Sequence, residues 1–168
     1  MNYRTICLVA GLGLFLFAHK ICAAESLDNT DEVQQLLDDL VAAYKTKDIP
    51  SIMSAYLPDE RLVVFDVTPP YKFVGARAYR QFFADFYAEF PGPIDVVATQ
   101  RSITRNGDFA FAHETDTWNV TSKDGERTSM ATLETYVFQK IQGRWFIVHE
   151  HASVPADTSA STAQPRQP

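Results

Sequence analysis

Residues 127–154, RTSMATLETYVFQKIQGRWFIVHEHASV, decide the fold. Two runs that alternate polar and apolar residues flank the dipeptide Gln142-Gly143, which marks a hairpin turn. Two earlier Gly-centred turns, at Asn106-Gly107 and in residues 123–126, separate further strands of similar length. Strands of this length joined by such turns predict an antiparallel meander over residues 94–154.

Helical patterns occupy most of the chain before this meander. Residues 33–48 repeat apolar side chains at helical spacing, with Val33, Leu37, Leu40 and Tyr44 on one stripe. The expected elements are helices at 33–48, 49–57 and 76–90 and a strand at 61–67, with an irregular connection before the third helix. Helices first and antiparallel strands later predict an α+β fold, with about three N-terminal helices on one face of a sheet.

Both ends of the chain carry patterns that differ from the central domain. Arg4, the apolar run Thr5–Ala18 and the small residues before Glu25 predict a secretory signal peptide over residues 1–24. We therefore expect a periplasmic or secreted protein, with a domain at 25–155. Residues 156–168 are poor in apolar side chains and predict a disordered tail.

Composition limits the possible partners and chemistry. Cys7 and Cys22 both lie in the predicted signal peptide, so the mature chain would have neither a disulfide nor a Cys-ligated metal. The formal net charge of −6 becomes more negative when Arg4 and Lys20 leave. Such acidity argues against nucleic acid and anionic membrane surfaces as partners. The sequence shows no phosphate-binding glycine loop and no dinucleotide fingerprint, so no cofactor is predicted.

Three segments together resemble the nuclear transport factor 2-like superfamily, in its SnoaL-like and ketosteroid isomerase-like branch. They are AAYKTKDIPSIMSAY (42–56), VVFDV with VGARAYRQFF (63–67 and 74–83), and GRWFIVHEHASVP (143–155). The resemblance implies a cone: a curved sheet around the helices, an apolar pocket between them, and a homodimer through the sheet. It leaves the activity open, because this fold hosts isomerases, cyclases, hydrolases, dehydratases and members without a known reaction.

Asp66 is the first candidate for a catalytic residue. It stands among apolar neighbours in VVFDVTPP, and burial of a carboxylate raises its pKa toward the range useful for a general base. The resemblance supports this role, because the isomerases' proton-shuttling aspartate precedes the glycine that opens the third helix by the same interval as Asp66 precedes Gly75. The alternative is an exposed or capping aspartate at a strand end.

Glu134 is the second candidate. Alternation places it on a largely apolar face with Thr132, Tyr136 and Phe138. By resemblance it occupies the position of the isomerases' neutral carboxylic acid, which donates a hydrogen bond to a developing enolate oxygen. The alternative is an ion pair with a neighbouring strand.

One position departs from the isomerase pattern. The tyrosine that supplies the second oxyanion donor in those enzymes corresponds to Leu40 in this chain. Loss of such a donor costs roughly two to three decades in rate. Tyr44 lies one helical turn later and could point inward or belong to the core. Steroid isomerisation is therefore not expected, although a related proton transfer stays open.

His149 and His151 alternate with Glu150 near the end of the chain. Simple alternation puts both histidines on the face of Trp145 and Ile147, about 7 Å apart. We expect them to line the pocket or an interface. A metal site is an alternative that needs a third ligand, for which His113 is the remaining mature histidine.

These patterns lead to a functional hypothesis with two alternatives. We expect an exported protein that binds a small hydrophobic molecule in its cone pocket, without established catalysis. The first alternative is a proton-transfer enzyme with Asp66 as base and Glu134 as neutral acid, and the second is the histidine metal site. The expected pocket residues are Tyr44, Phe86, Trp118, Tyr136, His149 and His151.

Overall fold

The computed structural model describes residues 30–155, so the predicted signal peptide and C-terminal tail lie outside the described residues. Its elements, in chain order, are α1 (Asp31–Thr46), α2 (Ile49–Ala55), β1 (Val63–Phe65), β2 (Lys72–Val74), α3 (Ala76–Glu89), β3 (Asp95–Asn106), β4 (Phe109–Thr121), β5 (Arg127–Ile141) and β6 (Arg144–Ser153). In the described range, no helix is long and apolar enough to cross a membrane.

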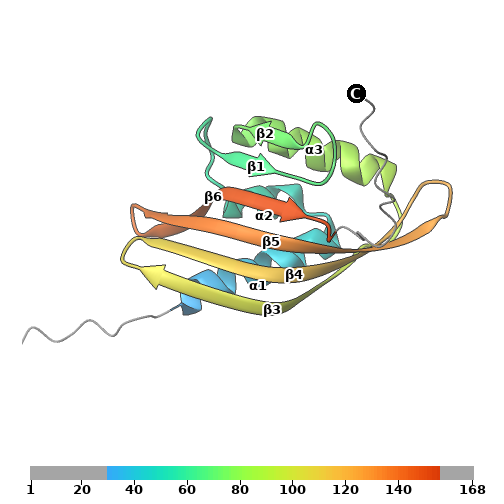
Figure 1. The fold of residues 1–168 in the computed structure, drawn as a ribbon. Coiled ribbons are helices and arrows are strands. Elements are labelled where there is room, and N and C mark those ends of the chain that lie inside the picture. Colours follow the sequence, from blue (N-terminus) through green and yellow to red (C-terminus); the bar gives the residue numbers. More distant parts are fainter. Residues whose placement is uncertain (1–29, 156–168) are drawn as a thin grey trace, which may run out of the picture.

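The strands form one curved sheet in the order β2-β1-β6-β5-β4-β3 (Figure 1). Strands β3 to β6 are the predicted antiparallel meander. The sheet as a whole is mixed, however, because β1 pairs with β6 in parallel. A long excursion through α3 and the meander separates these two strands, so no tight turn forces them to be antiparallel.

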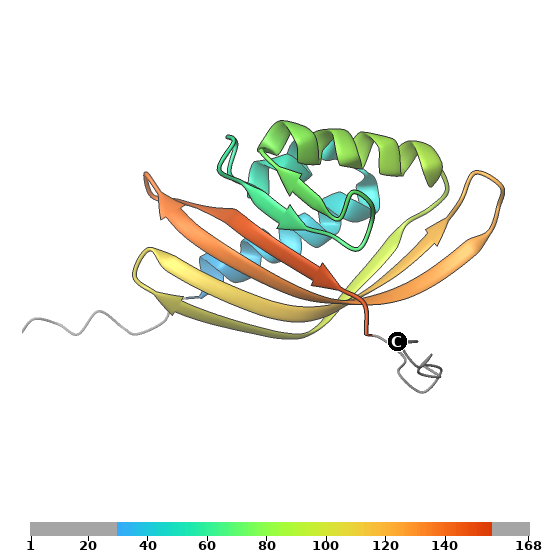
Figure 2. The ribbon, with the colours of Figure 1, turned by 45° about the horizontal axis from the view of Figure 1, so that its top comes forward.

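The helices cover one side of the sheet, as Figure 2 shows for α1 and α3. The stripe of α1 buries Val33, Leu37, Leu40 and Tyr44 in the main core. Asp48 caps α2, since its side chain accepts the Ser51 backbone N–H. The predicted α+β architecture, with a curved sheet on about three helices, is confirmed.

A β-bulge in β6 reverses which side chains face the helices. Val137 pairs with His149 but Phe138 pairs with Ile147, so Val148 is an extra residue in this strand. Trp145 and Ile147 are buried before the bulge, whereas Glu150 and Ala152 are buried after it. The prediction that both histidines share the face of Trp145 and Ile147 is therefore wrong.

Candidate functional site

A cavity of about 300 Å³ opens between the helices and the inner face of the sheet. Its walls come from α1, α3, the segment after β1, and the inner faces of β4, β5 and β6. Six of the residues proposed from sequence lie on these walls, namely Tyr44, Asp66, Phe86, Trp118, Glu134 and Tyr136. This volume is at the lower end of the range of small-molecule sites, which suits a compact ligand.

Aromatic rings form most of the wall. Helix α3 contributes Phe82, Phe83 and Phe86 because apolar residues recur along it every three or four positions. The Trp118 ring lies 4.9 Å from that of Tyr44 and 6.3 Å from that of Phe86, measured between centroids. These contacts join α1, α3 and β4 into one aromatic surface around the cavity.

Glu134 points into the cavity from the middle of β5. Strand alternation buries it with Thr132 and Tyr136, as predicted. The predicted alternative, an ion pair with a neighbouring strand, does not form among the described residues. Burial, together with nearby Glu150, raises the pKa of Glu134 well above its usual range. Burial therefore favours the neutral form of Glu134, which is able to donate a hydrogen bond.

Glu150 is a second buried acid on the same wall, and sequence reasoning missed it. The Tyr56 hydroxyl donates to its Oε2 at 2.6 Å, and the Tyr79 hydroxyl lies 3.4 Å from its Oε1. The Tyr44 hydroxyl is 2.8 Å from that of Tyr56, which extends the network to α1. Burial raises the pKa of Glu150 to about 8, although the Tyr56 hydrogen bond opposes the shift.

The tyrosines of this network remain hydroxyl donors. Burial raises the pKa of Tyr44, Tyr56 and Tyr79 well above the usual value. Tyr44 therefore lines the cavity with its hydroxyl held by Tyr56, whereas Leu40 is packed in the main core. The position that carries a tyrosine in the isomerases thus offers no hydrogen-bond donor in this chain.

Asp66 lies just after β1, at the edge of the cavity. Its Oδ1 accepts the Thr68 backbone N–H at 2.7 Å, so it also organises the turn that follows. Burial raises the pKa of Asp66, and the Thr68 N–H opposes that rise. Asp66 therefore caps a turn, as the alternative predicted, and also faces the cavity, and its role as a base stays a prediction.

A further acidic pair lies along β4. Glu114 is bound by Arg101, which also binds Asp38 of α1 at 2.5 Å. Arg101 lies within a bulge between Thr99 and Ser102 of β3, where Gln100 and Arg101 stand opposite the single residue Glu114 of β4. Asp116 lies next on the inner face and is buried, and burial and nearby Glu114 raise its pKa to about 7. Alternation within AHETDTW could have indicated both acids.

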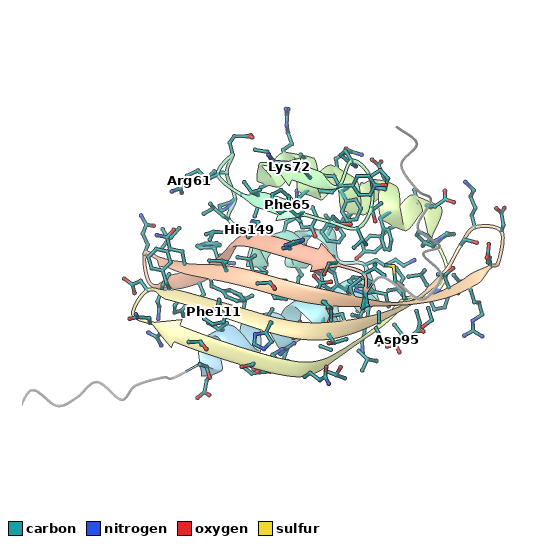
Figure 3. The ribbon with its side chains drawn as sticks, in the orientation of Figure 1. Arg61, Phe65, Lys72, Asp95, Phe111 and His149 are labelled. Atoms are coloured by element: carbon teal, nitrogen blue, oxygen red, sulfur yellow. The ribbon has the colours of Figure 1, made fainter. Side chains whose placement is uncertain are left out.

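His149 and His151 lie on the outer face of the sheet and do not line the cavity. The bulge at Val148 explains this correction, because it turns Glu150 inward in their place. Nδ1 of His149 is 2.8 Å from the Val63 carbonyl oxygen, and the imidazole of His149 lies beside the Phe65 ring (Figure 3), which it meets edge-on. The His151 imidazole meets the same ring edge-on.

The metal alternative finds no third ligand within the described residues. Thr135 of β5 pairs with His113 on one side and with His151 on the other. The two histidines are therefore two strand spacings apart, roughly 10 Å, which is too far to share one ion. In residues 30–155 no group of three or more His, Cys, Asp or Glu side chains is arranged to hold a metal.

The family model described as a SnoaL-like domain matches residues 33–157 of the chain. No curated protein matches the chain. A solved structure similar to this one is an NTF2-like protein of unknown function from Pseudomonas putida. It is 25% identical, with a TM-score of 0.69, and the match covers 84% of this chain and 99% of that one.

Two further solved structures share the fold at lower identity. The first is a nuclear transport factor 2-like protein from Salmonella enterica serovar Typhimurium, which is 17% identical with a TM-score of 0.71 over 80% of this chain and 96% of that one. The second is a ketosteroid isomerase-like protein from Erwinia carotovora atroseptica, also 17% identical, with a TM-score of 0.64 over 77% and 98%. They support the nuclear transport factor 2-like cone.

Proposed function

This chain belongs to the SnoaL-like domain family, and from that premise we propose that it binds a small, largely apolar molecule in the inner cavity. The observation that carries the proposal is the aromatic cavity with carboxyl groups in its wall. The apolar body of the ligand would pack against α3 and Trp118. Its polar end would meet Glu134 and Glu150.

The wall chemistry supports a ligand with one apolar part and one polar part. Apolar contacts supply most of the binding free energy in such cavities, and a few polar groups fix the orientation. Here the polar groups are concentrated on β5 and β6, opposite the rings of α3. Thr132 stands next to Glu134 on the inner face of β5 and adds a hydroxyl to the same wall.

Filling the cavity tests this proposal. Met130 lies on the cavity wall and is half-buried, so Met130→Trp adds volume inside. The matched control is Ser129→Trp, because Ser129 is exposed and points to the opposite face of β5. In calorimetric titrations with 1-naphthol, we expect binding to weaken at least about tenfold in Met130→Trp and to persist in Ser129→Trp. Equal binding by all three proteins would place the probe elsewhere and contradict the proposal.

Proton transfer on a carbonyl compound is the second candidate function. It is favoured by the presence of Asp66 and Glu134 on one cavity, both with raised pKa values. Asp66 would remove a proton from the carbon beside the carbonyl group and return it to a different carbon. Glu134, neutral, would donate a hydrogen bond to the enolate oxygen formed in between.

The variant Asp66→Asn separates the two functions. It removes the base but keeps the shape and the acceptor for Thr68. Exchange of the α-protons of a bound ketone with deuterated water, followed by NMR, measures proton transfer directly. Loss of exchange with unchanged affinity supports the enzyme, whereas a wild-type protein that binds the ketone without exchange supports binding alone.

We also propose that the protein is exported and works as a homodimer through the outer face of the sheet. Phe109, Phe111 and Leu133 expose 54%, 45% and 47% of their surface on this face, which favours an apolar partner such as a second copy.

N-terminal sequencing of the protein from cell fractions tests export, and a mature chain that begins at Glu25 outside the cytoplasm is the expected result.

A further inference from the structure

The polar end of the cavity is acidic and has no compensating positive charge of its own. Three of the lining residues are carboxylic acids, namely Asp66, Glu134 and Glu150, and Asp116 lies beside Thr132 on the adjacent strand. Within residues 30–155, the lining includes no Lys, Arg or His. The partly buried cation nearby, Arg101, is already bound by Glu114 and Asp38.

Several oxygen atoms at this end lack a hydrogen-bond partner among the described residues. They are Oε2 of Glu134 and Oγ1 of Thr132 in the cavity lining, and both carboxyl oxygens of Asp116, which is buried outside the lining; Thr132 is close enough to Glu134 to lower its pKa. These side chains are 5%, 2% and 1% exposed, in the same order. Unpartnered buried polar atoms are costly, so a site built in this way calls for a ligand that supplies hydrogen-bond donors.

The type of donor follows from the rest of the wall. An ammonium group has three N–H donors and no acceptor, which matches a set of carboxyl and hydroxyl oxygens. Eight of the lining residues are aromatic, and aromatic faces attract cations in addition to packing apolar groups. A neutral carbonyl group is only an acceptor, so it could pair with one protonated acid but would supply no donor to the remaining oxygen atoms of the wall.

We propose that the ligand of this cavity is a small apolar amine, bound as the ammonium ion with its nitrogen at Glu134, Thr132 and Glu150. This inference rests on the proposed binding function and adds the chemical class of the ligand. The apolar body of the amine lies along α3 and Trp118, in the part of the cavity that aromatic rings surround. It also opposes the second candidate function, in which Glu134 must stay neutral to act on a carbonyl oxygen.

Binding of a cation is coupled to proton release in such a site. A positive charge beside Glu134 and Glu150 lowers both pKa values, so protons that these acids hold in the free protein leave on binding. The charged and titratable groups that face the two acids are Tyr44 of α1, Tyr56 after α2, Asp66 after β1, Tyr79 of α3, Asp116 of β4, Tyr136 of β5 and, beyond Glu114, Arg101 of β3. All except Arg101 are acids or phenols, so none of them replaces the ligand's charge.

The test compares two probes of one shape, 2-phenylethylamine and 2-phenylethanol, by isothermal titration calorimetry. An aliphatic amine stays protonated below about pH 9, like the Lys side chain. We expect the amine to bind wild type at least about tenfold more tightly than the alcohol at neutral pH. Its affinity should rise as the pH approaches the pKa of Glu150, about 8, and this acid ionises. Titration in buffers of different ionisation enthalpy should show proton release.

Variants link the effect to these acids. Glu134→Gln and Glu150→Gln remove charge with little change of shape, and we expect each to weaken the amine about tenfold and leave the alcohol unchanged. Glu126→Gln, at an exposed position in the β4–β5 turn, is the matched control and should bind like wild type. Thermal unfolding of each variant checks that it is folded.

The outcomes separate this inference from the proposed function. If the alcohol binds as tightly as the amine, or if affinity for the amine falls as pH rises, the ligand is not a cation although the cavity still binds. If neither probe binds, both the inference and the binding function are overturned. If the amine binds equally well to Glu134→Gln and Glu150→Gln, it is held away from these acids and the inference fails.

Discussion

Replacing Glu150 with glutamine should remove one part of the pH dependence of this protein's stability, beside the parts that Glu134 and Asp116 contribute. In the unfolded chain the Glu150 carboxyl has its ordinary pKa of 4.5, whereas burial raises the pKa in the folded protein to about 8. Between these two values the folded protein binds more protons than the unfolded chain. The free energy of unfolding therefore falls as pH rises through this window.

The expected magnitude follows from the two pKa values. Each pKa unit corresponds to about 1.4 kcal/mol, so the full interval is worth about 5 kcal/mol, of which about 4 kcal/mol falls between about pH 5 and pH 8. Glutamine is neutral throughout and can still accept the Tyr56 hydroxyl. At about pH 5 the free energy of unfolding of the variant should match that of wild type to within about 1 kcal/mol. Between about pH 5 and pH 8 this free energy should fall by several kcal/mol less in the variant than in wild type.

Urea unfolding at several pH values measures this difference. Glu126→Gln is again the control, and its profile should run parallel to that of wild type. A wild-type stability that is flat or rises from about pH 5 to pH 8, with Glu150→Gln showing the same profile, would refute the claim that this acid is buried and neutral.

Three further perturbations test other parts of the structure. Tyr56→Phe removes a hydroxyl that donates to Glu150, so we expect the free energy of unfolding in urea to fall by about 1 kcal/mol at neutral pH. The pKa of Glu150, measured by carboxyl NMR titration, should rise above about 8, and an unchanged pKa would contradict the hydrogen bond. Gly75→Ala should lower the free energy of unfolding by at least about 1 kcal/mol, because Gly75 has a φ of 84° and an added Cβ would meet Glu60. A variant as stable as wild type would argue against this backbone conformation. Phe111→Asp places a charge on the exposed outer face of the sheet and should convert the proposed dimer to a folded monomer, measured by sedimentation velocity and circular dichroism. An unchanged sedimentation coefficient would exclude this face.

Most of the architecture could be predicted from periodicity and turn residues. The long strands β3 to β6 are recognisable because Gly-centred turns separate them. In addition, apolar and polar side chains alternate along each strand. Asp66 and Glu134 could be singled out for the same reason, since each is an acid among apolar neighbours. The parallel pairing of β1 with β6 depends on which edge of the sheet is free, and a local pattern does not contain that information.

The bulge at Val148 explains why simple alternation predicts the wrong face for His149 and His151 in the last strand. Phe146, Ile147 and Val148 are all apolar, so alternation does not reveal the point at which one extra residue is inserted. Every side chain after the bulge then changes face, and Glu150 takes the inward position expected for the histidines. Glu150 has two tyrosine partners, Tyr56 just after α2 and Tyr79 in α3, and Tyr44 of α1 joins them through Tyr56. The convergence of these separate segments is a tertiary property.

Native mass spectrometry tests the central claim, a ligand-binding cavity, most directly. Wild type, Met130→Trp and Ser129→Trp would each be incubated with a metabolite extract of the organism that encodes the chain and then desalted. We predict one small organic mass on wild type and on Ser129→Trp, and none on Met130→Trp. A mass retained equally by all three proteins, or the absence of any bound mass on wild type, would contradict the account.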